Sequence, residues 1–184
     1  MTAPDPAIDD LLAELDAKRA AGATLPELVE AAVRGLHESD RRFNWTGVYE
    51  LRSDDMLHLG PYVGAATDHT TIPVGRGVCG TAVAEKRDLN IPDVRHLTNY
   101  LACSLRTRSE LVILIRDGET IYAQIDIDSH KVNAFDVSAT RKAERVAAWL
   151  APVYRDARAA AAAAGETPAA EPAAEPATAP EPAP

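Results

Sequence analysis

The side chains best suited to carry out chemistry are the two cysteines of this 184-residue chain, Cys79 and Cys103. Cys103 lies in a predicted loop with arginines close by in sequence, and cationic neighbours favour the reactive thiolate. Cys79 stands at the expected N-terminus of a helix entered through Gly75 and Gly77, where the helix dipole lowers the pKa of a thiol. Both positions also suit a small buried residue. Two thiols beside loops can run a redox cycle, but their positions leave open which attacks and which resolves.

Two carboxylates follow in the segment IDIDS, at Asp126 and Asp128. Residues two apart on a strand face the same side, so both should project from one face at the end of the strand expected over residues 121–127. They could bind an ammonium group, share a proton or line a solvated face. Glu110 begins the preceding predicted strand and can reach the same space. The histidines, cysteines and acidic residues lack zinc-site spacing, so spacing predicts no metal site.

The composition narrows the class of protein. A net charge of −9 and a sequence pI near 5.0 argue against nucleic-acid binding, which depends on clustered Lys and Arg. The acidic start, MTAPDPAIDD, is unlike a secretory signal, and no apolar run approaches a membrane span. We therefore expect a soluble cytoplasmic protein that does not bind membranes and whose cysteines are reduced.

The elements expected to position these residues alternate between helical and strand patterns. Asp5-Pro6 starts a helix that ends near Gly22, and Thr24 with Glu27 forms a capping box for a second helix. Period-two patterns and turn residues, including Asp117-Gly118, predict antiparallel hairpins. The strands are expected at residues 45–51, 56–63, 89–91, 111–115 and 121–127, and further helices at 78–86 and after Phe135-Asp136.

This order predicts an α+β fold with helices packed on a central antiparallel sheet. We expect residues 1–40 to form helices that pack on the domain or on a dimer partner. Residues 41–156 should form the folded domain. Residues 157–184 are rich in Ala, Pro and Glu and lack large apolar side chains, so a disordered tail is expected.

Several motifs together resemble one known family. In order and at about the right spacing, the chain contains NWTGVY, IPVGRGVCGTAVAEKR, PDV, LAC, SE and QIDIDS. This pattern is similar to the GAF-domain free methionine-(R)-sulfoxide reductases, over about residues 43–135. The resemblance implies a GAF-like sheet of about six strands and a homodimer with a closed pocket for free methionine sulfoxide. It implies no bound cofactor and a thioredoxin-type reductant.

The resemblance also implies roles for individual residues. Cys103 matches the nucleophile, which would become a sulfenic acid, and Cys79 the resolving cysteine, which would form a disulfide with it. Glu110 and Asp128 match carboxylates that assist protonation. The residues matching substrate-binding positions are Asp126, Trp45 and Tyr49.

Two departures from the family pattern motivate an alternative. His69 stands where many members carry a third cysteine, and residues 104–108 after Cys103 differ from the common pattern. The alternative is a non-enzymatic GAF module that senses a small molecule or a redox state.

Overall fold

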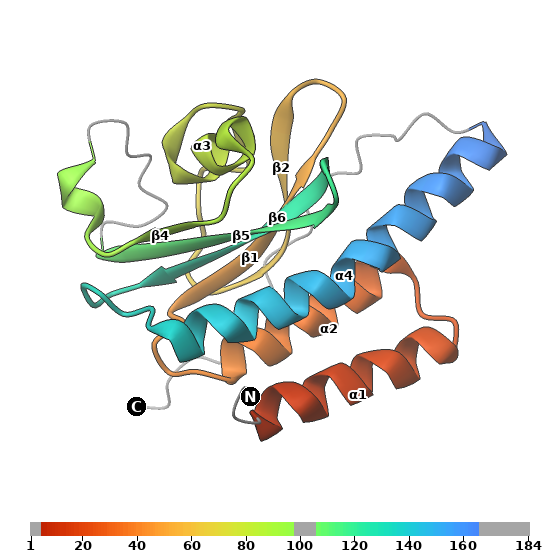
Figure 1. Cartoon of the computed structure of the whole chain (residues 1–184), viewed down its shortest axis with the longest axis horizontal. Helices are drawn as coiled ribbons and strands as arrows, with labels where there is room; N and C mark the ends of the chain where they lie inside the picture. The colour runs from red at the N-terminus through yellow and green to blue at the C-terminus, as the bar shows by residue number, and fades with distance from the viewer. Residues whose placement is uncertain (1–4, 98–105, 166–184) are drawn as a thin grey trace.

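A computed structural model describes residues 5–97 and 106–165. Within these ranges, six strands form one antiparallel sheet in the order β3-β2-β1-β6-β5-β4 (Figure 1). The α+β fold and its six-stranded antiparallel sheet are confirmed. The strands are β1 (Trp45–Leu51), β2 (Met56–Val63), β3 (Thr71–Pro73), β4 (Leu89–Ile91), β5 (Ser109–Asp117) and β6 (Thr120–Ser129).

Helices cover the two faces of the sheet unequally (Figure 1). On one face lie α2 (Leu25–Glu38) and α4 (Val137–Ala164), with α1 (Pro6–Ala20) packed on their outer side, whereas α3 (Gly77–Glu85) lies on the other face. Alternating side chains of β5 separate the two cores. Leu111, Ile113 and Ile115 pack with the three helices, and Val112 and Leu114 pack with α3.

The predicted helix starts agree with the structure. The Asp5 side chain accepts a hydrogen bond from the Ile8 amide at 3.4 Å and caps α1. The Glu27 carboxylate accepts from the Thr24 amide at 2.7 Å, which completes the expected capping box. α1 and α2 bury their apolar stripes in the core of this same chain.

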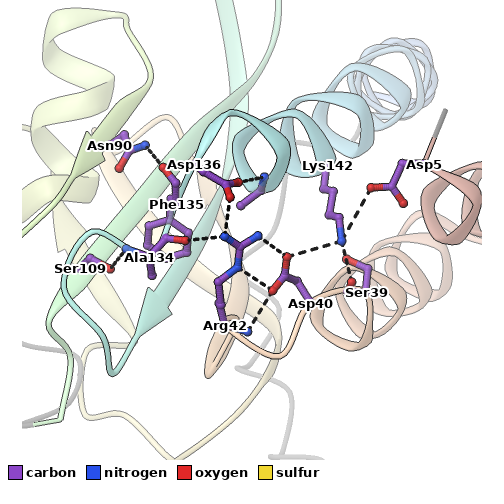
Figure 2. Close-up of polar contacts among 11 residues, drawn as sticks. Asp5, Ser39, Asp40, Arg42, Asn90, Ser109, Ala134, Phe135, Asp136 and Lys142 are labelled. Carbon is purple, nitrogen blue, oxygen red and sulfur yellow. Dashed lines mark hydrogen bonds and ion pairs between the residues drawn. The ribbon is translucent and has the colours of Figure 1, made fainter. Parts of the chain in front are cut away.

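A polar cluster ties the end of α2 to the start of α4 (Figure 2). The Arg42 guanidinium donates hydrogen bonds to Asp40 at 2.9 and 2.7 Å, to Asp136 at 2.8 Å and to the Ala134 carbonyl at 3.0 Å. Arg42 also lowers the pKa of Asp40 to about 2. Lys142 donates to the Ser39 carbonyl at 2.7 Å. Because β1 follows Arg42 and β6 precedes Ala134, these contacts anchor one end of each of these two neighbouring strands.

Two sequence predictions need correction. The tail expected from residue 157 was wrong for residues 157–164, because α4 continues through Ala164. The reason is that alanine has the highest helix propensity, and a run of alanines extends an already anchored helix. Residues 166–184 lie outside the described residues. The short edge strand β3 was not predicted, because three residues carry too little pattern.

Within the described ranges, no helix combines the length and the apolar character that a bilayer span requires.

Candidate active site

Three neighbouring strands bring the predicted carboxylates and aromatic residues to one face of the sheet. Residues directly opposite each other in an antiparallel pair share a face. In β6, Asp128 pairs with Trp45 of β1 and with Glu110 of β5. Two residues earlier, Asp126 pairs with Gly47 and Val112. Since Val112 packs with α3, these side chains all project towards the α3 side.

Helix α3 adds Cys79 to this face. Cys79 is the third residue of α3, and the entry turn needs positive φ at Gly75 (88°) and Gly77 (62°), a conformation that glycine adopts without strain. The Cys79 thiol donates to Glu110 Oε1 at 3.8 Å. One ligand atom each from Cys79, Glu110 and Asp126 lies within 4.8 Å of the others, and all three side chains are buried. The structure thus brings together residues from three separate elements.

Burial changes the protonation of the carboxyl groups. It raises the pKa of Asp126 from 3.8 to about 7. Burial, reinforced by the negative charges of the neighbouring aspartates, raises the pKa values of Glu110 and Asp128 well above their usual range. The nearby Cys79 and Thr107 oppose these rises only in part. At neutral pH the cluster therefore retains protons that it can donate.

Among the described residues, the side-chain oxygens of Asp126 and Asp128 find no hydrogen-bond donor. Asp126 and Asp128 are 0% and 1% exposed, and no described residue donates to any of their side-chain oxygens with normal hydrogen-bond geometry. Buried polar atoms are usually paired, so unpaired ones point to a ligand, an ion or water.

Two aromatic residues of β1 form a wall beside the carboxylates. The Trp45 indole donates to the Ala65 carbonyl at 3.1 Å and stacks on Tyr62 with ring centroids 5.4 Å apart. The Tyr49 hydroxyl donates to the His69 carbonyl at 2.8 Å. Gly47 lies between them, and a Cβ there would collide with the Trp45 ring. The missing side chain of Gly47 therefore lets the indole lie flat against the strand.

Sequence reasoning missed two polar residues on this face. Gln124 is 0% exposed, and neither amide atom has a partner among the described residues. The same two-residue alternation that links Asp126 to Asp128 extends back to Gln124 and could have identified it. Thr107, 3% exposed, lies near Asp128 and acts on its pKa.

Cys103, the predicted nucleophile, lies outside the described residues, as do Ser104 and Leu105 of the divergent segment. The structure describes the segment again from Arg106, and the Arg108 backbone amide donates to the carbonyl of Ser129, the last residue of β6, at 2.8 Å.

Comparison with known proteins agrees with this architecture. The model of the GAF domain family matches residues 11–154. The chain belongs to the GAF domain family. A solved structure of a GAF domain with 26% identity superimposes with a TM-score of 0.73 over 80% of this chain and 87% of the other.

Within the GAF family, the chain falls in the branch that contains the free methionine-R-sulfoxide reductases. The type II free methionine-R-sulfoxide reductase of Thermoplasma acidophilum is 34% identical, with a TM-score of 0.67 over 72% of this chain and 96% of that chain. The Neisseria meningitidis free methionine-R-sulfoxide reductase, solved in complex with its substrate, is 28% identical, with a TM-score of 0.74 over 87% and 96%.

A curated relative with the same name, free methionine-R-sulfoxide reductase, is also similar to this chain. The free methionine-R-sulfoxide reductase of Escherichia coli (strain K12) is 43% identical over 94 residues, which are 51% of this chain and 56% of that protein. The first curated relatives are matched over 56 to 62% of their own length, so the chain spans little more than half of them.

Proposed function

We propose that this GAF protein reduces free L-methionine (R)-sulfoxide to methionine by thiol chemistry. The observation that carries the proposal is the cluster of Glu110, Asp126 and Asp128, buried beside the Cys79 thiol with raised pKa values. A sulfoxide oxygen leaves only if it is protonated, and carboxylic acids that stay neutral at neutral pH supply that proton. The choice of substrate rests on the similarity to relatives that are named free methionine-R-sulfoxide reductase.

The buried carboxylate of Asp126, which accepts no hydrogen bond from the described part of the chain, would bind the substrate ammonium. Its pKa of about 7 lets it lose its proton when a cation arrives, because an opposite charge favours the ionised form. Trp45 and Tyr49 would enclose the apolar part of the amino acid, since their rings form the adjacent wall. Such a site would select the free amino acid, because a peptide-bound residue has no ammonium group.

In the chemical step, the Cys103 thiolate would attack the sulfoxide sulfur while Asp128 or Glu110 protonates the oxygen. The sulfur–oxygen bond breaks and the protonated oxygen departs as hydroxide. Hydroxide then bonds to the Cys103 sulfur, the newly formed sulfur–sulfur bond breaks, methionine leaves with that bond's electron pair, and Cys103 becomes a sulfenic acid. The acid that gave its proton is then an anion within a buried cluster, and it recovers a proton from solvent or from Cys79.

Recycling would use Cys79. Its thiol condenses with the Cys103 sulfenic acid to a disulfide and releases water, and a thioredoxin-type dithiol then reduces the disulfide by exchange. The Cys79 thiol already donates to Glu110, so that carboxylate is positioned to accept its proton. This cycle needs no bound cofactor.

The test is a coupled assay with thioredoxin, thioredoxin reductase and NADPH on free methionine (R)-sulfoxide. Wild type should turn over and Cys103→Ser should be inactive. Cys79→Ser should form about one methionine per chain and then stop with thioredoxin as reductant, since the sulfenic acid persists. Equal, background-level methionine formation by wild type and Cys103→Ser would refute the proposal. Sulfoxide that binds without turnover would favour the sensor alternative.

A further inference from the structure

The closest group of potential ligand atoms in the described residues consists of Cys79 Sγ and carboxylate oxygens of Glu110 and Asp126. These atoms lie within 4.8 Å of one another, and Sγ is 3.8 Å from Glu110 Oε1. A tetrahedral zinc ion, with Zn–S near 2.3 Å and Zn–O near 2.1 Å, holds its sulfur and oxygen ligands about 3.6 Å apart. We propose that these three side chains bind a divalent metal ion, of which Zn²⁺ fits best, and that the ion takes the place proposed above for the substrate ammonium.

Unsatisfied oxygens give independent support for a cation. The ligand Asp126 is 0% exposed, and Asp128, which is not one of the three ligands, is 1% exposed. None of their side-chain oxygens accepts a hydrogen bond from a described residue. Asp128 also lies close enough to Glu110 for its charge to act on that carboxyl group. Buried carboxylates without donors are costly, and a dication compensates for the missing partners.

The donor types select the metal. One thiolate with two carboxylates suits the borderline-soft Zn²⁺, whereas Mg²⁺ and Ca²⁺ prefer sites made entirely of oxygen ligands. Three protein ligands also leave one tetrahedral position open to water or to another small ligand. The spacing of the sequence does not predict this site, because its ligands come from α3, β5 and β6, and Cys79 precedes Glu110 by 31 residues.

Metal binding would exclude the other uses of the same atoms. The ion takes up the Asp126 carboxylate and holds Cys79 as a thiolate on the metal. Under the proposed function, on which this consequence rests, the ion would compete with the substrate ammonium and prevent disulfide formation. The binding itself does not depend on reductase activity. Since the ligands must lose protons, binding releases protons to the buffer and weakens as the pH falls.

The test uses the reduced full chain without a histidine tag, with no sulfoxide present. Titration with Co²⁺ should produce the near-ultraviolet absorption of a cobalt–thiolate bond at about one ion per chain, and Zn²⁺ should displace the Co²⁺. Cys79→Ser should abolish the band. Asp126→Asn and Glu110→Gln should each weaken Zn²⁺ binding by at least about tenfold, as measured by calorimetry.

Two control variants test whether other side chains bind the metal ion. Cys103→Ser should keep the band, because Cys103 is not among the three ligands. His58→Ala should leave the Zn²⁺ affinity of the cluster unchanged, although it removes the exposed His58–Asp54 pair, whose atoms are 2.9 Å apart and could hold surface zinc.

The proposal is overturned if the band persists in Cys79→Ser, or if neither carboxylate variant changes the Zn²⁺ affinity. Circular dichroism checks that each variant is folded. If Cys79→Ser does not fold, the two carboxylate variants still test the site. Because the readout is optical and calorimetric, failure to bind metal is distinguishable from failure to reduce the sulfoxide in metal-free buffer.

Discussion

Replacing Asp126 by asparagine should stabilise the protein by an amount that grows as the pH rises from about 4 to about 7. Burial raises the pKa of Asp126 from 3.8 to about 7, so the folded state holds a proton that the unfolded state releases more readily. The stabilisation from this proton is fully present below the unfolded-state pKa and is lost as the pH rises through the folded-state pKa. Asparagine keeps a neutral side chain of the same shape at every pH and avoids that loss.

The magnitude follows from the size of the pKa change. One pKa unit corresponds to about 1.4 kcal/mol, so a rise from 3.8 to about 7 corresponds to about 4 kcal/mol. Above about pH 8, Asp126→Asn should gain up to that free energy of unfolding relative to wild type, and near pH 4 the two proteins should be equally stable. Burial is the largest cause of that rise, so the gain measures the cost of ionising a carboxyl group out of contact with water.

Urea denaturation followed by circular dichroism, in buffer with a chelator, measures this difference at several pH values. The control is Asp54→Asn, which removes an exposed carboxylate whose pKa is lowered chiefly by its hydrogen bond to His58. Its effect should have the opposite sign, since the stability due to Asp54 is present above its unfolded-state pKa and is lost at lower pH. A pH-independent gain for Asp126→Asn, or a loss of stability at pH 8, would refute the reasoning.

Three further outcomes follow from the same contacts. Gln124→Leu should raise the free energy of unfolding by about 1 to 3 kcal/mol, because it removes two buried amide atoms that have no hydrogen-bond partner among the described residues. It should also weaken methionine sulfoxide binding in calorimetry if the amide contacts the ligand. Gly47→Ala should cost about 1 to 3 kcal/mol and shift the fluorescence of Trp45, because the new methyl collides with its ring. Arg42→Ala should cost a similar free energy in urea denaturation, and Arg42→Lys should restore only part of it, because lysine cannot bridge Asp136 and its other acceptors in a planar fork.

Local features of this chain could be predicted from the sequence because neighbouring residues decide them. Asp5 caps α1, and Asp117-Gly118 forms the turn of the β5–β6 hairpin, as predicted. The two-residue spacing put Asp126 and Asp128 on one face of a strand. Where local pattern was misleading, as in the alanine run at the end of α4, the anchored helix before it determined the outcome. The role of Cys103 stays a prediction from the sequence.

The convergence of the site was decided by the tertiary structure alone. β6 lies between β1 and β5, so Asp128 faces Trp45 on one side and Glu110 on the other. The docking of α3 then brings the Cys79 thiol to 3.8 Å from Glu110. Local sequence patterns cannot predict these distances, because the distances depend on strand order and on contacts between residues far apart in the chain. The raised pKa values have the same origin, since a carboxyl group is desolvated only when the fold closes over it.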